Sequence, residues 1–267
     1  MQRLNFLRKF FHFLILSFAA FFIISEKPLH AEHSELKLIQ KISKAIVHIK
    51  AESGGIFNAG QDAILDRNTG RILVLTDLVG VKQDKYGCGI IVSKRGLIVT
   101  NFHTVKDAGR LTVILQDGKE VPATLTHSVP EKDFAVLRID PPGPLTAIQF
   151  ADSNQVRKGA RVYLVGHSPQ VKNSVGGGEV VGMDEKQNAE ADPDGTLNII
   201  QIVTGFELTE GDSGSAILDQ KGKLLGMVAA GHLFSKNPIY AIPSNIIKNR
   251  FLEFLKTASK QPAVNGS

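Results

Sequence analysis

The chain has 267 residues, of which 43% are hydrophobic and 21% are charged, so it contains enough apolar sequence for a large core. Its formal net charge is +5, but the first 31 residues hold four basic residues and one acidic residue and carry +3 of it. The remainder has no dense basic stripe with interleaved aromatic residues, which disfavours nucleic-acid binding.

The N-terminus is typical of a secretory signal peptide. Basic residues occur at positions 3, 8 and 9, and segment 10–24 is apolar apart from one histidine and one serine. Residues 28–31 then offer a cleavage site after Ala31. This apolar run is shorter than the roughly 17–25 residues of a membrane-spanning helix. We expect residues 1–31 to be removed and the protein to be periplasmic or secreted in a bacterium, with no stable membrane anchor. An uncleaved N-terminal anchor is the alternative.

Cysteine usage agrees with a bacterial envelope protein. Cys88 is the only cysteine, so no internal disulfide can form. It lies in a glycine-flanked turn, where we expect a small buried packing residue. Four histidines lie outside any motif and are expected at the surface or satisfied by polar neighbours: His33, His48, His127 and His167. Because no His/Cys cluster has metal-ligand spacing, we expect neither a metal nor a cofactor.

The chain beyond residue 36 reads as a succession of short strands. Residues 36–51 begin helix-like and become strand-like at 46–49, and residues 52–86 form an irregular insertion with a short strand at 72–75. Apolar runs between turn residues follow at 89–93, 97–100, 111–115, 121–126 and 135–139. After a proline-rich linker at 141–144, further runs follow at 160–165, 178–183, 196–203, 215–218, 224–229 and 239–242. Alternating runs with frequent turns predict barrels or a sandwich.

Helical spacing returns only near the C-terminus. Apolar residues at 246, 247, 251, 254 and 255 predict a helix over 244–258, with Ser244 as a candidate N-cap. Residues 259–267 are expected to form a flexible tail.

The run Gly-Asp-Ser-Gly-Ser at 211–215 presents Ser213 on a tight turn. Gly211 allows its own N–H and that of Ser213 to converge, as a developing oxyanion requires. A serine nucleophile also needs a histidine to accept its proton and a buried carboxylate to orient that histidine. His103 and Asp133 precede Ser213 in the order His, Asp, Ser, which is one known chain order of this triad. Asp140 and Asp152 compete with Asp133 for the carboxylate role.

Five collinear segments carry a resemblance to a known family: GCGIIVSKRGLIVTNFHTV, DFAVLRI, ADSNQVRKGARVYLVGHSP, GDSGSAILDQKGKLLGMV and IYAIPSNII. With them the chain resembles trypsin-like serine proteases of the Deg/HtrA branch, from about Ser43 to Ile247. The resemblance implies an all-β, chymotrypsin-like fold. Two six-stranded antiparallel β-barrels would hold the active site between them, and a short C-terminal helix would follow.

The same resemblance assigns roles and boundaries. It makes His103 the general base, Asp133 the orienting acid and Ser213 the nucleophile, with Gly211 and Ser213 supplying the oxyanion-hole N–H groups. We expect one protease domain over 32–258. Its parts are barrel 1 at about 36–140, barrel 2 at about 145–243 and the helix at 244–258.

The chain departs from the family pattern at several points. Ser215 replaces the usual second glycine after the nucleophile, and Cys88 stands where serine is usual. Asp212 replaces the asparagine that bacterial members usually carry, and the sequence does not indicate its partner. No PDZ module is expected after the protease domain.

The specificity pocket is the least determined part. By resemblance it lies between the residues before Ser213 and the strand Ala229, Ala230 and Gly231, whose small side chains leave an open wall. Glu207 would favour a basic P1 residue, and His232 at the pocket mouth an acidic one. Deg-type relatives prefer small aliphatic P1 residues, and this is the preference we expect first.

The predicted function is serine endopeptidase activity on proteins or peptides, through an acyl-enzyme, in envelope protein quality control. The alternative is a catalytically silent relative that binds peptides or unfolded chains. Related Deg proteases are often trimers, so the resemblance suggests a homo-oligomer with a trimer as the candidate, and the 52–86 insertion could supply contacts.

Overall fold

The computed structural model describes residues 29–53, 63–65, 72–74, 84–167, 174–184, 199–204, 208, 211–231 and 238–259. It separates into a unit at residues 1–37 and a compact unit from Leu38 to Ser267. Helix α2 spans Leu29–Ile42, and Ile39 of its last turns is fully buried in the compact unit. Among the described helices, none is both long and apolar enough to cross a bilayer. Most of the predicted leader lies outside the described residues.

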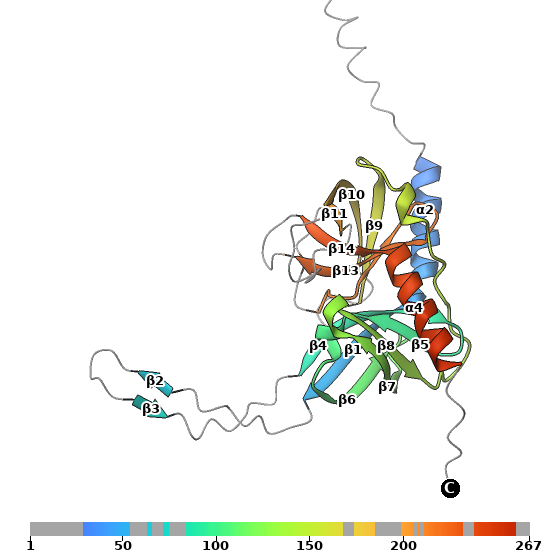
Figure 1. Cartoon of the computed structure of the whole chain (residues 1–267). Coiled ribbons are helices and arrows are strands. Elements are labelled where there is room, and N and C mark those ends of the chain that lie inside the picture. Colours follow the sequence, from blue (N-terminus) through green and yellow to red (C-terminus); the bar gives the residue numbers. More distant parts are fainter. Residues whose placement is uncertain are drawn as a thin grey trace, which may run out of the picture. The chain divides into compact units, whose positions relative to one another are not determined.

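The first barrel closes from six antiparallel strands in the order β1-β4-β5-β8-β7-β6 (Figure 1). The strands are β1 (Ile46–Ser53), β4 (Lys85–Ser93), β5 (Leu97–Thr100), β6 (Ala108–Ile114), β7 (Glu120–Val129) and β8 (Phe134–Ile139). Because successive strand residues face opposite sides, one set of each strand fills the barrel interior. That interior includes Val47, Ile49, Ile91, Ile98, Val113 and Leu137.

The second barrel also closes from six antiparallel strands, in the order β10-β11-β14-β13-β12-β9 (Figure 1). The strands are β9 (Arg161–Gly166), β10 (Ser174–Asp184), β11 (Ile199–Thr204), β12 (Ala216–Leu218), β13 (Leu224–Gly231) and β14 (Ile239–Pro243). Its interior includes Val162, Leu164, Val180, Ile202, Ile217 and Val228.

The residues between the barrels bond to both of them. Ile148 N–H donates to Ile91 of barrel 1 at 2.9 Å, and the Leu224 N–H of barrel 2 donates to Gln149 at 2.7 Å. A separate apolar cluster joins residues of both barrels, among them Ile90, Phe134, Val165, Ala216 and Met227. The barrels therefore share a core instead of meeting only through the linker.

The predicted two-barrel fold is confirmed, but some strands begin at other residues than the sequence predicts. Strand β4 begins at Lys85, before the predicted start at 89, because residues 85–88 pair with β1. The predicted strand at 72–75 is β3 (Ile72–Val74), and it pairs with β2 (Ala63–Leu65), which the pattern did not indicate.

Helix α4 spans Ser244–Ala258, as the apolar spacing predicts. The prediction of Ser244 as its N-cap is wrong, since Pro243 occupies that position. The Ser244 hydroxyl instead donates to the Ala151 carbonyl at 3.0 Å, which fastens the start of the helix to the connection between the barrels.

Candidate active site

Asp133 holds His103 by both its ring and its backbone. His103 lies on the single-turn helix α3 (Phe102–Val105), and its Nδ1 is 2.8 Å from Asp133 Oδ2. The His103 N–H donates to the other carboxylate oxygen at 2.9 Å, and Asn101 Nδ2 donates to Oδ2 at 3.0 Å. The Asp133 side chain is 7% exposed and that of His103 is 46% exposed. A buried carboxylate thus holds a half-exposed imidazole by one of its two ring nitrogens.

Asp133 owes its direction to a tight turn. It follows the 3₁₀ helix η2 (Pro130–Lys132), and its N–H donates to the Pro130 carbonyl at 3.0 Å. Its φ of 45° and ψ of 45° are left-handed, which costs a non-glycine residue roughly 1–2 kcal/mol. A conformation of this kind persists only where its surroundings hold it, and such residues cluster at functional sites.

Ser213 lies between two glycines with positive φ, Gly211 at 100° and Gly214 at 86°. The turn is bonded to β13 because Gly214 N–H donates to the Val228 carbonyl at 2.9 Å. Ser215 N–H donates to the Asp212 carbonyl at 3.0 Å. Since C=O and N–H of a trans peptide point in opposite directions, the Ser213 N–H points away from Ser215. The preceding residue, Glu210, lies outside the described residues.

Strand β4 brings the histidine and serine segments together. The Cys88 N–H of this strand donates to the Ser213 carbonyl at 2.6 Å. A Cβ placed on the neighbouring Gly87 would lie 2.4 Å from Thr104 Cγ2 and 3.2 Å from Ser213 O. Helix α3, which carries His103, and the Ser213 turn therefore both reach Gly87. Only glycine leaves room for this approach.

Cys88 is more than the packing residue that the sequence indicates. It is fully buried, as expected, but each of its polar groups is also used. Its Sγ donates a hydrogen bond to the Gly211 carbonyl at 3.4 Å. The same Sγ accepts hydrogen bonds from Ser215 Oγ and from the His167 N–H, each at 3.3 Å. Its carbonyl accepts from Thr100 Oγ1 at 2.7 Å. The thiol thus braces the turn that presents Ser213.

The Cys88 thiol is not suited to act as a nucleophile. Burial raises its pKa to about 11, and the nearby Asp212 charge contributes in the same direction. The hydrogen bonds from Ser215 and the His167 backbone act against this shift without cancelling it. Because the thiolate is the reactive form, the protonated buried thiol is inert.

Asp212 is buried at 7% exposure beside β9. A Cβ on Gly166 would lie 3.4 Å from Asp212 Oδ1 and 2.9 Å from the hydroxyls of Ser174 and Ser215. The carboxylate that the sequence left without an assigned partner therefore lies in a polar corner near two serines.

His48 and His167 are both buried, each with 4% exposure. Of the two environments expected for them, the surface is wrong, and contact with polar neighbours is what His48 has through hydrogen bonds to the backbone of Gly87 and His167. His48 stacks on Tyr86 at a centroid distance of 5.5 Å and approaches His167 at 6.2 Å, and its Nδ1 has no hydrogen-bond partner. Burial, followed by the charge of His167, lowers the pKa of His48 to about 4, although hydrogen bonds to the backbone of Gly87 and His167 oppose the shift.

The predicted specificity residues are only partly described. Ala229 lies on β13 at 3% exposure, and the β13–β14 register shifts between Val228 and Ala230. Ala229 is therefore the extra residue of a bulge, a device that re-aims a strand near active sites. Ala230 and Gly231 continue β13. Glu207 and His232 lie outside the described residues.

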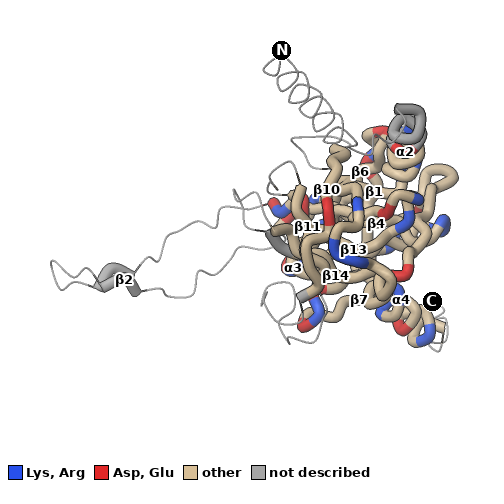
Figure 2. Tube along the Cα trace, turned by 90° about the horizontal axis from the view of Figure 1, so that it is seen from above, with Lys and Arg blue, Asp and Glu red and all other residues tan. Residues whose placement is uncertain are grey.

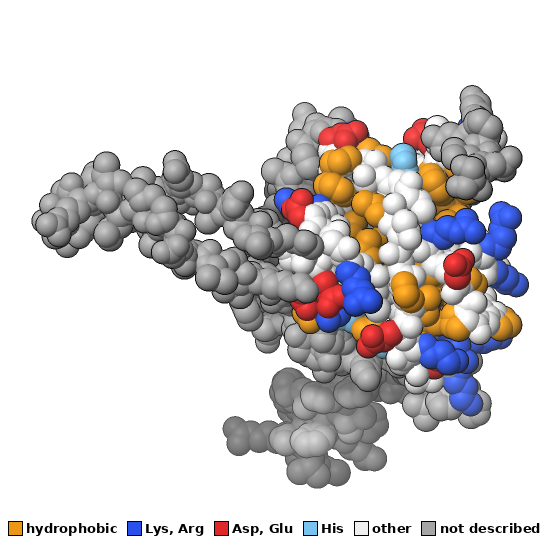
Figure 3. Space-filling model, turned by 90° about the horizontal axis from the view of Figure 1, so that it is seen from below, with side chains coloured by type: hydrophobic (Ala, Val, Ile, Leu, Met, Phe, Trp, Pro, Cys, Tyr) orange, Lys and Arg blue, Asp and Glu red, His pale blue; other side chains and the backbone are white. Residues whose placement is uncertain are grey.

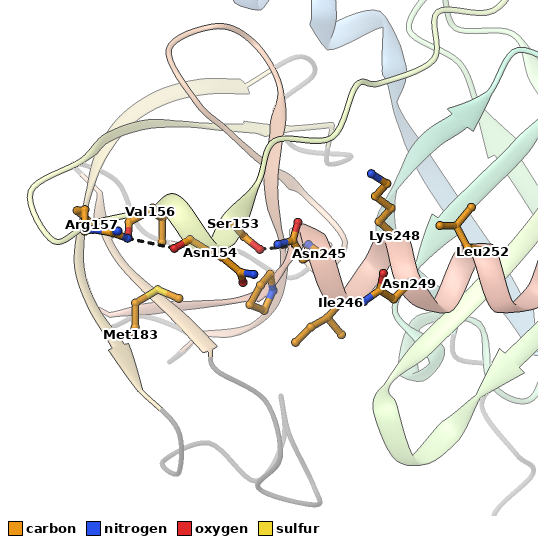
Figure 4. A pocket seen from close by; sticks show the side chains of 11 residues that line it. Ser153, Asn154, Val156, Arg157, Met183, Asn245, Ile246, Lys248, Asn249 and Leu252 are labelled. Carbon is orange, nitrogen blue, oxygen red and sulfur yellow. Dashed lines mark hydrogen bonds between the residues drawn. The ribbon is translucent and has the colours of Figure 1, made fainter.

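A groove of about 750 Å³ lies apart from these residues. It runs between the 3₁₀ helix η3 (Ser153–Gln155), the end of β10 and helix α4, and no candidate site residue lines it (Figure 4).

Within the described ranges, no group of three or more His, Cys, Asp or Glu side chains is arranged to hold a metal ion. Basic and acidic residues are interspersed along the described trace (Figure 2), and basic side chains lie beside hydrophobic and acidic ones on the face in Figure 3.

Comparison with known proteins identifies the class. Residues 87–227 match the family described as the trypsin-like peptidase domain, and the chain belongs to that family. This match contains His103, Asp133 and Ser213.

Among curated proteins, the chain is similar to the periplasmic serine endoprotease DegP of Escherichia coli (strain K12). It is 33% identical over 178 residues, which cover 64% of this chain and 36% of DegP. A probable periplasmic serine protease do/HhoA-like of Haemophilus influenzae is 31% identical over 177 residues, covering 64% of this chain and 36% of the relative. The chain spans about a third of the length of these relatives.

A comparison with solved structures finds the same fold. The solved structure of the HtrA-type protease AlgW with tripeptide superposes with a TM-score of 0.66 and 22% identity, covering 84% of this chain and 64% of that one. The Deg/HtrA resemblance stated from the motifs is therefore confirmed.

Proposed function

We propose that the protein is a serine endopeptidase that cleaves proteins or peptides through an acyl-enzyme. The observation that carries the proposal is the 2.8 Å contact between His103 Nδ1 and the buried Asp133 carboxylate. This carboxylate fixes the imidazole tautomer that leaves Nε2 free to accept a proton. The homology to DegP, whose name states serine endoprotease activity, supports the same reaction.

The proposed reaction assigns one task to each residue. Ser213 Oγ attacks the peptide carbonyl carbon while His103 Nε2 takes its proton, and Asp133 stabilises the imidazolium. The N–H groups of Ser213 and Gly211 receive the oxyanion. His103 then protonates the departing amine and later activates the water that hydrolyses the acyl-enzyme.

The alternative is a silent relative that only binds peptides. The retained bonds of His103 to Asp133, and the peptide orientation that turns the Ser213 N–H away from Ser215, favour the enzyme. A fluorophosphonate probe distinguishes the two, because it reacts only with an activated serine.

The decisive experiment compares wild type with Ser213→Ala. Because loss of the nucleophile costs ~10⁴–10⁶ in rate, Ser213→Ala should show no detectable cleavage of casein and no probe labelling. Wild-type cleavage by the purified variant would overturn the assignment of Ser213. An unlabelled and inactive wild type would favour the peptide-binding alternative.

We also propose export to the periplasm after removal of residues 1–31, since the relatives named above are periplasmic proteases. A homotrimer is the assembly we expect, and light scattering of the purified mature chain tests it.

For specificity, we expect a substrate backbone to add as a strand along β13 near Ala229–Gly231. We expect small aliphatic P1 residues, with basic P1 selection by Glu207 and acidic selection by His232 as alternatives. A peptide library varied at P1 separates these three outcomes. An unchanged profile in Glu207→Gln would remove the basic option.

A further inference from the structure

Arg250 of α4 contacts the two residues on either side of Asp133, Lys132 and Phe134. Its Nη1 donates to the Lys132 carbonyl at 2.9 Å, and its guanidinium carbon lies 6.0 Å from the centroid of the Phe134 ring. Arg250 is 9% exposed and Phe134 is fully buried. Burying a cation is costly unless it is partnered, so this placement ties the arginine to the turn.

The contact with Lys132 constrains the peptide plane that leads into Asp133. The C=O of that plane accepts from Arg250 and its N–H donates to Pro130 at 3.0 Å. Because a peptide unit is planar and rigid, holding both of its polar groups fixes the plane from which φ of Asp133 is measured. The left-handed φ of 45° then sets where the carboxylate points.

The direction of the carboxylate decides the position of His103. Asp133 meets the His103 backbone at 2.9 Å and the His103 ring at 2.8 Å. A rotation of the Asp133 turn would lengthen both contacts together.

Helix α4 follows the last strand of barrel 2 and contacts β13 and β14. It touches barrel 1 a second time where Phe254 stacks on His127 of β7 at 5.3 Å. The helix of the serine-bearing barrel therefore holds the aspartate turn of the histidine-bearing barrel.

We propose that Arg250 is a positioning residue of the triad, which fixes the Asp133 turn and through it His103. This inference rests on the proposed function, because it assumes that Asp133 orients a catalytic histidine. Because Arg250 is buried and acts on His103 through the Asp133 turn, its removal should lower kcat and leave KM nearly unchanged.

The test compares Arg250→Met, Arg250→Ala and a matched control on the same helix, Lys248→Met. The control also removes one positive charge, but Lys248 lines the groove of Figure 4. Arg250→Met should lose roughly 10²-fold in kcat per active site, with KM within about twofold, because small misplacements of catalytic groups cost this much. Lys248→Met should behave as wild type. Active sites are counted by fluorophosphonate titration, so loss of folded protein is separated from loss of rate.

Chemical rescue adds a readout that a merely structural arginine would not produce. Guanidinium ion at sub-denaturing concentration should restore part of the kcat of Arg250→Ala and leave wild type and Lys248→Met unchanged. Wild-type kcat per titrated site in Arg250→Met, or a loss confined to the number of titrated sites, would overturn the proposal.

A measurement without substrate separates this inference from the function. The low-field proton NMR signal of the His103–Asp133 hydrogen bond should be present in wild type and Lys248→Met and be lost or broadened in Arg250→Met. If wild type neither cleaves nor labels but the signal still depends on Arg250, the proposed function fails and the positioning role stands. If the signal is unchanged in Arg250→Met, the positioning role fails.

Discussion

At the scale of single residues, the site depends on positions where a side chain would not fit. Gly214 has a φ of 86°, and a Cβ on it would lie 2.0 Å from the Cys88 carbonyl oxygen and 2.8 Å from its carbon. The partner atoms belong to backbone and cannot rotate away. The main chains of the turn and of β4 are therefore in direct contact at Gly214, with no space for a side chain between them.

Gly214→Ala should consequently destabilise the protein and abolish activity. Gly118→Ala is the matched control, because Gly118 has a φ of 84° and a Cβ there meets nothing within 4 Å. We expect the control to cost about 1 kcal/mol, the left-handed penalty alone. We expect Gly214→Ala to exceed about 3 kcal/mol, because backbone must also move. Urea unfolding measures both, and equal losses would contradict the steric argument.

His48 makes stability depend on pH. Its pKa falls from 6.5 to about 4 on folding, chiefly because burial disfavours the charged ring. Between pH 6.5 and about pH 4, His48 is protonated in the unfolded chain but remains neutral in the folded chain. Lowering the pH through this range therefore stabilises the unfolded state, and the free energy of unfolding decreases. Above pH 6.5 this contribution does not change.

His48→Phe keeps a ring against Tyr86 and removes the titrating group. We therefore expect the variant to lose less stability than wild type between pH 7.5 and pH 5, as urea unfolding at both values would measure. The variant also loses the hydrogen bonds of the His48 ring to the backbone of Gly87 and His167, so the comparison is made on the change in stability between the two pH values and not on the stability at pH 7.5. Parallel pH profiles for the two proteins would show that His48 does not carry the effect.

At the scale of elements, α4 has an inner and an outer face. Phe251 is 8% exposed, lies in the cluster shared by the barrels and approaches Phe254 at 6.2 Å. Its neighbour Leu252 is 42% exposed. Packing of the inner face is what places Arg250 against the Asp133 turn.

Phe251→Ala should therefore lower stability by about 3–5 kcal/mol, the usual cost of emptying a buried aromatic site. Leu252→Ala on the adjacent position should stay within about 0.5 kcal/mol of wild type. Thermal or urea unfolding of the two variants tests the assignment of the faces. Equal destabilisation would mean that Leu252 also lies in an interface.

At the scale of the whole molecule, the two barrels divide the site between them. His103 and Asp133 belong to barrel 1 and Ser213 to barrel 2, with the Cys88–Ser213 hydrogen bond of 2.6 Å joining them. The shared apolar cluster joins the two barrels, as the proposed catalysis by positioned groups would require.

Export is a property of the whole chain and is tested as one. Because the first 31 residues have the anatomy of a signal peptide, N-terminal sequencing of protein from the native envelope should begin at Glu32. Recovery from the membrane pellet with an intact Met1 would instead support the uncleaved anchor.

The sequence by itself determined a succession of short strands that predicts barrels or a sandwich, helix α4 and the Ser213 turn, and its resemblance to a known family selected the two barrels and the residues proposed as the triad. Alternating apolar runs set which face of each strand is buried, and Ser213 lies between glycines that permit its turn. These are local properties, since they depend on neighbours within a few positions of the chain.

Only the tertiary structure decided the roles of Cys88, His48 and Arg250. Cys88 meets Gly211 and Ser215 across more than 120 positions, and Arg250 reaches Lys132 across 118. No periodicity or spacing encodes such contacts, because they arise when closed barrels bring distant backbones to the same point. Burial then changes the chemistry of each group, raising the pKa of the thiol and lowering that of the imidazole.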